Sequence, residues 1–172
     1  MNGDGGFMAS FESQGLDDFI NLAIFTDRQI NSVIGRSIHP GARLMANAVK
    51  KAVKGIPVDD RKSHKHGGIK TGITSKQKKG LQDSFGIAKI RKTRHGWDVK
   101  LGFDGYNEIV TKKYPKGQPN AMVARSINSG TSFMRAYPFM DMTVEANEEA
   151  TVQKISDQFD KELEKIWNRA KL

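Results

Sequence analysis

Two histidines separated by one residue, His64 and His66, are the side chains best spaced to bind a metal ion. On an extended strand, residues two apart point to the same side, so the two imidazoles would form half of a site. The nearest carboxylates, Asp59 and Asp60, would have to complete it. Arg61 and the neighbouring lysines oppose a divalent cation electrostatically. We therefore predict no native metal site and no cofactor.

Residue patterns typical of catalysis are missing or incomplete. The chain of 172 residues has no cysteine, which excludes disulfides, thiolate metal sites and cysteine nucleophiles, and no serine lies in a G-x-S-x-G elbow. The glycine-rich run 67–72 includes Lys70 and Thr71 but lacks the residue order of a phosphate-binding loop. The adjacent acids Glu148 and Glu149 would point apart on a helix. The sequence therefore predicts a protein that is not an enzyme.

The net charge of +9 is unevenly distributed along the chain. Residues 1–34 carry −4, residues 35–136 carry +16 and residues 137–172 carry −3. A basic block of this size usually faces a polyanion or an acidic protein surface, and a solvated surface that favours solubility is the alternative. No sequence-reading DNA motif is present, so contact with nucleic acid would be made through phosphates. The basic segment 59–80 and the run that contains Lys89, Arg91, Lys92 and Arg94 are the candidates for that contact.

The segment 59–80 has the most unusual composition. It contains seven Lys or Arg residues and four glycines, but only Ile69 and Ile73 as large apolar residues. This composition predicts an extended basic loop or β-hairpin arm inserted in the domain. Its cations are the candidates for contact with DNA or with an acidic neighbour: Arg61, Lys62, Lys65, Lys70, Lys76, Lys78 and Lys79.

Apolar residues recur at helical spacing near both ends of the chain. They predict one helix from residue 16, another from residue 26, and a helix over residues 40–54 with basic residues off its apolar face. Pro40 would either kink the chain or open this last helix. The C-terminal third predicts a helix of roughly 25–30 residues, entered at Pro138.

Strands are predicted between these helices. Apolar and polar residues alternate over residues 95–105, which predicts a half-buried strand, and residues 85–92 and 106–113 predict two more. Residues 121–128 fit either a helix or a strand, and residues 1–14 predict a flexible segment or an edge strand. The sequence thus predicts a single α+β domain over the whole chain, with N-terminal helices and a long C-terminal helix packed on a small, mostly antiparallel β-sheet.

Short motifs follow one another in a recognisable order between residues 15 and 170. They are Pro57-Val58-Asp59 after the helix, then Gly80-Leu81 and Ser84, then Gly130-Thr131, then Pro138-Phe139-Met140 before the last helix. This order resembles the neck, or tail-completion, proteins of long-tailed bacteriophages, the gene-product-ten-like minor tail components. That family has a Thr-Gly pair directly after Pro-Val-Asp, whereas Asp60 and the basic segment follow here. Asn128 stands where the family has an acidic residue.

The resemblance implies a virion structural protein at the head–tail junction, made in the cytoplasm of a bacterial host. Its copies would form a homo-oligomeric ring that joins connector to tail and lets genomic DNA pass during assembly and ejection. The implied partners are the connector or stopper protein, the tail terminator and, non-specifically, double-stranded DNA. A tail-terminator ring protein and a basic, sequence-independent DNA-binding protein are the alternatives.

The motif residues are expected to define the fold. Asp59 is expected to accept backbone hydrogen bonds in the following turn, Gly130 to supply a backbone shape that a side chain would obstruct, and Phe139 to pin the last helix. No membrane partner is expected, because the longest apolar run is far shorter than the ~20 residues of a membrane-spanning helix.

Overall fold

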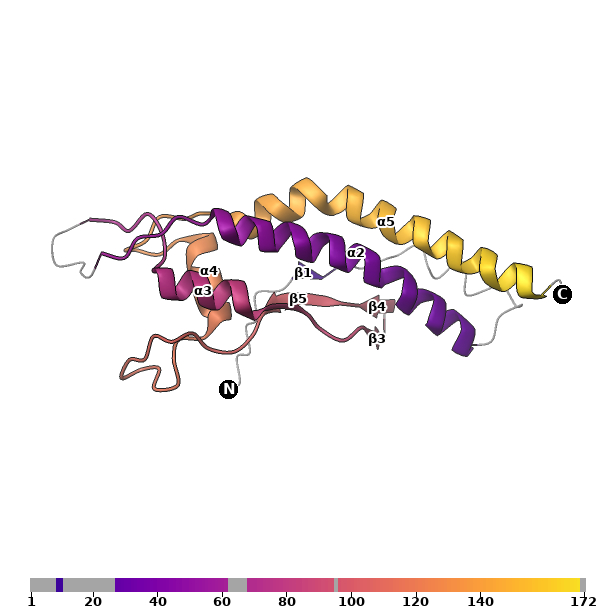
Figure 1. Ribbon diagram of the computed structural model, residues 1–172, viewed down its shortest axis with the longest axis horizontal. Coiled ribbons are helices and arrows are strands. Elements are labelled where there is room, and N and C mark those ends of the chain that lie inside the picture. The colour runs from indigo at the N-terminus through magenta and orange to yellow at the C-terminus, as the bar shows by residue number, and fades with distance from the viewer. Residues whose placement is uncertain (1–8, 11–26, 62–67, 95, 171–172) are drawn as a thin grey trace.

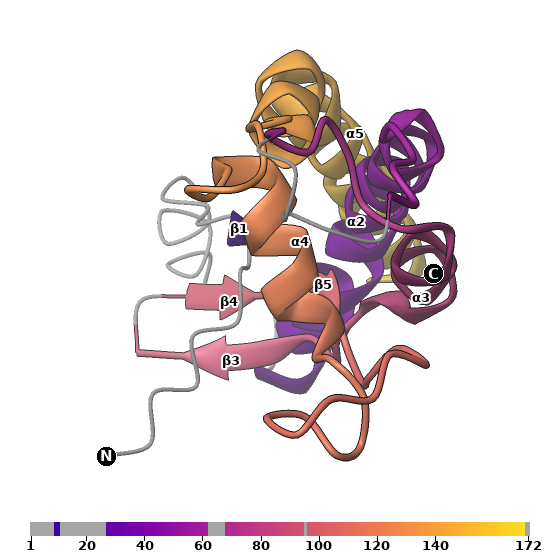
Figure 2. The same cartoon turned by 90° about the vertical axis from the view of Figure 1, so that its left-hand side faces the viewer.

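The computed structural model describes residues 9–10, 27–61, 68–94 and 96–170. Two long helices, α2 (Asp27–Gly55) and α5 (Phe139–Ala170), lie side by side along the molecule (Figure 1). The shorter elements lie on one side of this pair (Figure 2). They are β1 (Ala9–Ser10), α3 (Ser75–Ser84), β2 (Phe85–Ile87), β3 (Arg91–Thr93), β4 (Gly96–Asp98), β5 (Lys100–Phe103) and α4 (Asn120–Ser129). This arrangement confirms the predicted α+β class.

Helix α2 contains both the helix predicted from residue 26 and the helix predicted over residues 40–54. Its buried residues recur every three or four positions across Pro40, so one apolar face continues through the proline. A proline inside a helix removes one hydrogen bond and costs about 3 kcal/mol. Burial of several large side chains at about 1.5–3 kcal/mol each outweighs that cost. These side chains are Val33, Ile34, Ile38, Met45, Val49 and Val53.

Helices α2 and α5 are antiparallel. Arg36 forms an ion pair of 3.1 Å with Glu162, while Gly41, further along α2, lies against Thr151 and Ile155, which come earlier in α5. A Cβ atom at Gly41 would lie 2.4 Å from Cγ1 of Ile155 and 2.9 Å from the carbonyl oxygen of Thr151. The missing side chain therefore allows the two helices to approach closely.

The strands form one extended hairpin with a third strand at its side. β5 is central in the order β1-β5-β2, and both pairings are antiparallel. Beyond them β3 pairs with β4. Ile87 pairs with Leu101 whereas Arg91 pairs with Asp98, so the intervening segments differ by one residue and the hairpin contains a bulge.

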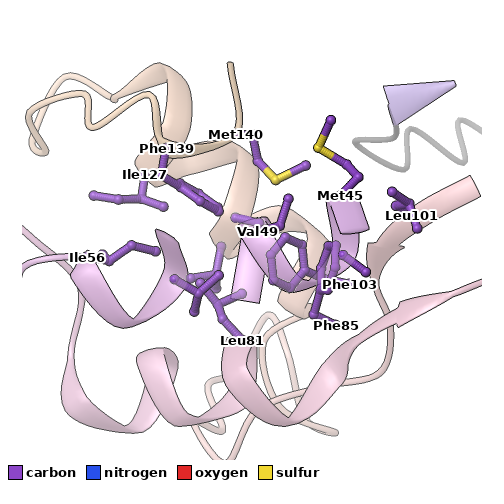
Figure 3. Packing of buried hydrophobic residues seen from close by; sticks show 14 of the residues in the cluster. Met45, Val49, Ile56, Leu81, Phe85, Leu101, Phe103, Ile127, Phe139 and Met140 are labelled. Atoms are coloured by element: carbon purple, nitrogen blue, oxygen red, sulfur yellow. The ribbon is translucent and has the colours of Figure 1, made fainter. Parts of the chain in front are cut away.

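One core fills the space between the layers (Figure 3). Met45 and Val49 of α2 are fully buried and face side chains from the sheet and from α5. Phe103 links the layers, because its ring centroid lies 4.9 Å from that of Phe85 and 6.1 Å from that of Phe139, in tilted and edge-on arrangements that aromatic rings favour. Phe139 thus pins α5 as expected.

The strand predictions are confirmed in part. The strand predicted over 95–105 contains β4 and β5, and the alternation holds in β5, where Leu101 and Phe103 are buried and Gly102 between them is partly exposed. All three residues of β4 are half-buried. The segment 85–92 contains β2 and most of β3. The prediction of a strand over 106–113 is wrong: the segment is irregular, with a single bridge from Tyr106.

Three further predictions concern single segments. Residues 121–128, which fit either element from sequence, lie in helix α4. β1 lies at the edge of its sheet, which agrees with the edge strand predicted within residues 1–14. The rest of that segment lies outside the described residues. So does the helix predicted from residue 16, up to the start of α2.

The prediction of a basic loop over the whole of 59–80 is wrong at its C-terminal end. Residues 75–80 are the first turns of α3, which continues to Ser84. Thr74 and Gln77 form a capping box: the Gln77 amide donates to Thr74 Oγ1 at 3.2 Å, and the Thr74 amide donates to Gln77 Oε1 at 2.9 Å. This local signal specifies a helix start although α3 buries only Leu81 fully.

Candidate interaction surface

The residues singled out from the sequence gather mainly at one end of the molecule, where α2 ends and α5 begins (Figure 1). We call this end the tip; it comprises residues 56–61, 68–74 and 130–138. Hydrogen bonds order the backbone of the tip, and the tip exposes both cations and apolar side chains.

Asp59 orders the first part of the tip. The side chain is buried, and its Oδ1 accepts a hydrogen bond of 2.7 Å from Nε of Arg61 while its Oδ2 accepts a second from Nη2. The backbone N–H groups of Thr71 and Arg61 also donate to this carboxylate, at 3.1 and 3.3 Å. The Arg61 guanidinium, with these amides, holds the pKa of Asp59 well below its usual range. The expected role of Asp59 as an acceptor in the following turn is confirmed.

The chain returns to Asp59 through a tight backbone contact. The Asp59 amide donates to the Ile73 carbonyl at 2.8 Å, and the Ile73 amide donates to the Pro57 carbonyl at 3.1 Å. A Cβ atom at Gly72 would lie 2.1 Å from the carbonyl oxygen of Pro57, so only glycine fits. The buried Ile73 side chain anchors this return in the core.

Asp60 connects the tip to α3. The Ser75 amide donates to its Oδ1 at 2.8 Å and the Ser75 hydroxyl donates to its Oδ2. These two donors lower the pKa of Asp60, which then carries its negative charge at the helix N-terminus where the dipole stabilises it. The two adjacent carboxylates therefore hold different segments: Asp59 binds Arg61 and Thr71, and Asp60 binds Ser75.

A second strand-like contact closes the tip on its other side. The Lys70 amide donates to the Phe133 carbonyl at 2.9 Å, and the Arg135 amide donates to the Lys70 carbonyl at 2.8 Å. Gly130 has φ of +73°, and a Cβ atom there would lie 2.9 Å from the Ala136 nitrogen, which confirms its predicted need for glycine.

Asn128 performs a role that the sequence did not suggest. Its side chain is buried; Oδ1 accepts from the Met140 amide at 2.9 Å and Nδ2 donates to Oδ2 of Asp141 at 2.8 Å. It thereby satisfies an unpaired donor of the first turn of α5. Asn128 thus caps α5 without a charge of its own.

The predicted basic residues do not form one free cluster. Arg61 is bound to Asp59, and Nζ of Lys78 donates to the carbonyls of Lys54 and Ile56, both at 2.8 Å, at the end of α2. Lys76 and Lys79 are exposed on α3, and Lys70 is half-buried. Lys62 and Lys65 lie outside the described residues, as do His64 and His66.

The tip also exposes apolar side chains. Val58, Ile69 and Phe133 retain 48%, 61% and 47% of their accessible surface. Ile69 precedes Lys70, whose backbone pairs with Phe133, so two of the three come from neighbouring segments. Exposed apolar groups beside cations are typical of a protein-binding surface. The sequence predicts the cations but not this apolar component, since it assigns Val58 to a structural motif and gives no role to Phe133.

Within the ranges that the structure describes, no three His, Cys, Asp or Glu side chains are grouped to hold a metal ion. None of the helices in those ranges is long and apolar enough to cross a membrane. Comparison with protein-family models, curated proteins and solved structures found no match to this chain.

Proposed function

We propose that this protein is a structural component of the head–tail junction of a long-tailed bacteriophage, where copies form a ring that joins connector and tail and lets DNA pass. The closure of the tip carries the proposal. Thr71 donates its amide to Asp59, and Gly72 packs against Pro57. The Pro-Val-Asp and Thr-Gly elements, consecutive in the resembling family, are therefore adjacent in space here although eleven residues, 60–70, separate them.

The later motifs support the same proposal, because each has a structural role. Leu81 of the Gly-Leu motif is buried in the core, Gly130 makes a turn with positive φ, and Phe139 anchors α5. A chain whose distinctive residues order its backbone and expose apolar side chains at the tip is suited to assembly.

Assembly with the partners tests the proposal. The purified chain is mixed with the connector and tail proteins encoded beside it, and the products are examined by native mass spectrometry and electron microscopy. A ring on the connector or on the tail end is the expected result. A chain that stays monomeric with both partners present overturns the proposal. Binding to the connector indicates a neck protein, and binding to the tail end indicates a tail terminator.

A sequence-independent DNA-binding protein is the second candidate, and the β-hairpin favours it. Lys89, Arg91, Lys92 and Arg94 project from β3 and its flanks, and all are exposed. Arg91 has a carboxylate nearby, Asp98, at 3.4 Å. These cations could contact phosphates without reading bases.

Titration of duplex DNA at several salt concentrations decides between the two candidates. If the hairpin cations bind four phosphates, the slope of log K against log salt is about −3.6, and K89A/K92A makes it less steep by about 2. Tight binding by the free monomer with that slope favours the DNA-binding protein. Weak binding that K89A/K92A leaves unchanged favours the junction protein.

A further inference from the structure

The outer faces of α2 and α5 carry opposite charges at the end of the helix pair nearest the tip. From residue 28 to its end, α2 has no acidic residue, and α5 has no basic residue before Lys154. Near the tip, α2 exposes the cations Arg43, Lys50, Lys51 and Lys54, which we call the basic ridge. Near the tip, α5 exposes the acids Glu145, Glu148 and Glu149, which we call the acidic ridge.

Each ridge follows one side of its helix. Residues 43, 50 and 54 are separated by about two turns and one turn, and residues 145, 148 and 149 lie within one turn. The acidic ridge also carries exposed apolar groups at helical spacing, since Met142 and Val152 retain 61% and 53% of their accessible surface. An apolar patch with charged neighbours has the composition of a protein interface.

The ridges do not neutralise each other within one chain. In the described part of the molecule, the ion pair that joins α2 to α5 is Arg36 with Glu162, towards the opposite end of the helix pair. No side chain of either ridge takes part in an ion pair formed within residues 27–61, 68–94 and 96–170. Asp141 is excluded from the acidic ridge because it accepts the hydrogen bond from Asn128.

The arrangement disfavours a polyanion as the partner of the basic ridge. Both ridges lie at the same end of the helix pair, on neighbouring helices, so the basic ridge is flanked by a helix face of opposite charge. That surface is less favourable to a polyanion than a uniformly basic one. Each ridge is attracted instead to a surface of the opposite charge, and a second copy of this chain offers one.

We propose that the basic ridge of one copy binds the acidic ridge of the next. A contact in which one copy supplies only its basic ridge and the next copy only its acidic ridge is head-to-tail, and it leaves one unused ridge on each outer copy. Such a contact repeats, and it closes into a ring when the rotation per copy divides a full turn. This inference rests on the proposed function and names the surfaces by which the ring would form.

Charge reversal tests the contact. In R43E/K50E/K51E both ridges become acidic, and in E145K/E148K/E149K both become basic, so neither variant should assemble alone. An equimolar mixture should assemble into alternating oligomers, and the chain with all six substitutions should assemble alone.

K112E/K113E/K116E is the matched control. It changes the net charge by the same amount as R43E/K50E/K51E, but in the exposed loop below the helix pair (Figure 2), and it should assemble as the wild type does. Native mass spectrometry gives the oligomer masses, and circular dichroism shows that each variant is folded.

Disulfide cross-linking detects a contact that is too weak for mass spectrometry. The chain has no cysteine of its own, so only introduced cysteines can react. Asn47 lies within the basic ridge and Ala146 within the acidic ridge, both on helices that the substitutions leave intact. Under mild oxidation, a mixture of N47C and A146C should form disulfides between positions 47 and 146 at least tenfold faster than either variant links to itself.

The outcomes separate this contact from the proposed function. Wild-type oligomers that persist in both reversed variants overturn the contact and leave a ring possible through other surfaces. Failure of the wild type to form oligomers, together with no preferred 47–146 disulfide, also overturns the contact. The proposed function is judged independently, by assembly on the connector or the tail.

Discussion

Asp59 is the residue on which the order of the tip depends. Its carboxylate receives the side chain of Arg61 and the amides of residues 61 and 71, and so joins two segments that a basic insertion separates. The sequence predicts that Asp59 accepts bonds from the following turn, and this is correct. It does not predict the bond from Thr71, since that bond crosses twelve positions and depends on where the insertion returns.

Replacement of Asp59 by Asn should lower stability and weaken its dependence on acid. The pKa of Asp59 is lower in the folded chain than the value of about 3.9 in the unfolded chain, so its contribution is complete above about pH 5 and is lost progressively below that, as the pH falls towards the lower pKa of the folded chain. Thermal melting between pH 3 and pH 7 measures this. The slope below pH 5 should decrease in D59N but persist in part, because the pKa values of Asp60 and Glu162 are also lowered.

Asp83→Asn is the control, since Asp83 is an exposed carboxylate on α3. It should leave the melting curves close to those of the wild type. Equal effects of D59N and D83N would contradict the assigned role of Asp59.

Gly72 and Gly35 should respond in opposite ways to alanine. At Gly72 the added Cβ would lie 2.1 Å from the Pro57 carbonyl oxygen, so the backbone must shift and G72A should lose about 1–3 kcal/mol of stability. At Gly35, inside α2, a Cβ atom would have nothing within 4 Å, so G35A should gain about 0.5–1 kcal/mol from helix propensity. Urea unfolding of both variants gives the free energies. A neutral G72A would show that the return of the chain to Pro57 is not tightly packed.

At the scale of elements, contacts from distant segments fix the tip end of the helix pair, where α2 ends and α5 begins. Lys78 of α3 binds the last carbonyls of α2, and Asn128 of α4 caps the first turn of α5. The two short helices therefore hold the long helices in position relative to the tip.

Asn128→Ala should destabilise the start of α5. The variant removes the acceptor of the Met140 amide, and loss of a helix N-cap costs about 0.5–2 kcal/mol. Asn128→Asp is the informative comparison, because it keeps an acceptor but places a second carboxylate beside Asp141. Urea unfolding should rank the wild type first, and N128D should regain stability relative to the wild type when Asp141 is replaced by Asn. No such recovery would contradict the contact between the two side chains.

The elements that the sequence predicts well are those with long apolar periodicity. The helix over 40–54, the long C-terminal helix and the alternating strand around Leu101 are examples. α3 escaped prediction because it buries only Leu81 fully and depends on capping by Thr74. The continuity of α2 through Pro40 could not be foreseen either, since burial on both sides of the proline decides it.

At the scale of the whole molecule, the structure divides the basic charge into parts with different roles. Arg61 and Lys78 stabilise the fold, the hairpin cations are exposed, and the basic ridge of α2 lies beside the acidic ridge of α5. The sequence predicts a basic block between acidic ends. Only the antiparallel packing of α2 and α5 shows that opposite charges adjoin at one end of the molecule.

The central claim is that this chain is a ring component of a phage head–tail junction. The most direct test is a cryo-electron microscopy reconstruction of a virion that contains the chain, refined around the junction between the capsid and the tail. If the chain has the proposed role, a ring of copies lies at this junction, with α2 of each copy beside α5 of the next and DNA in the central channel. Density for the chain only elsewhere in the particle, or its absence from the particle, would contradict the account.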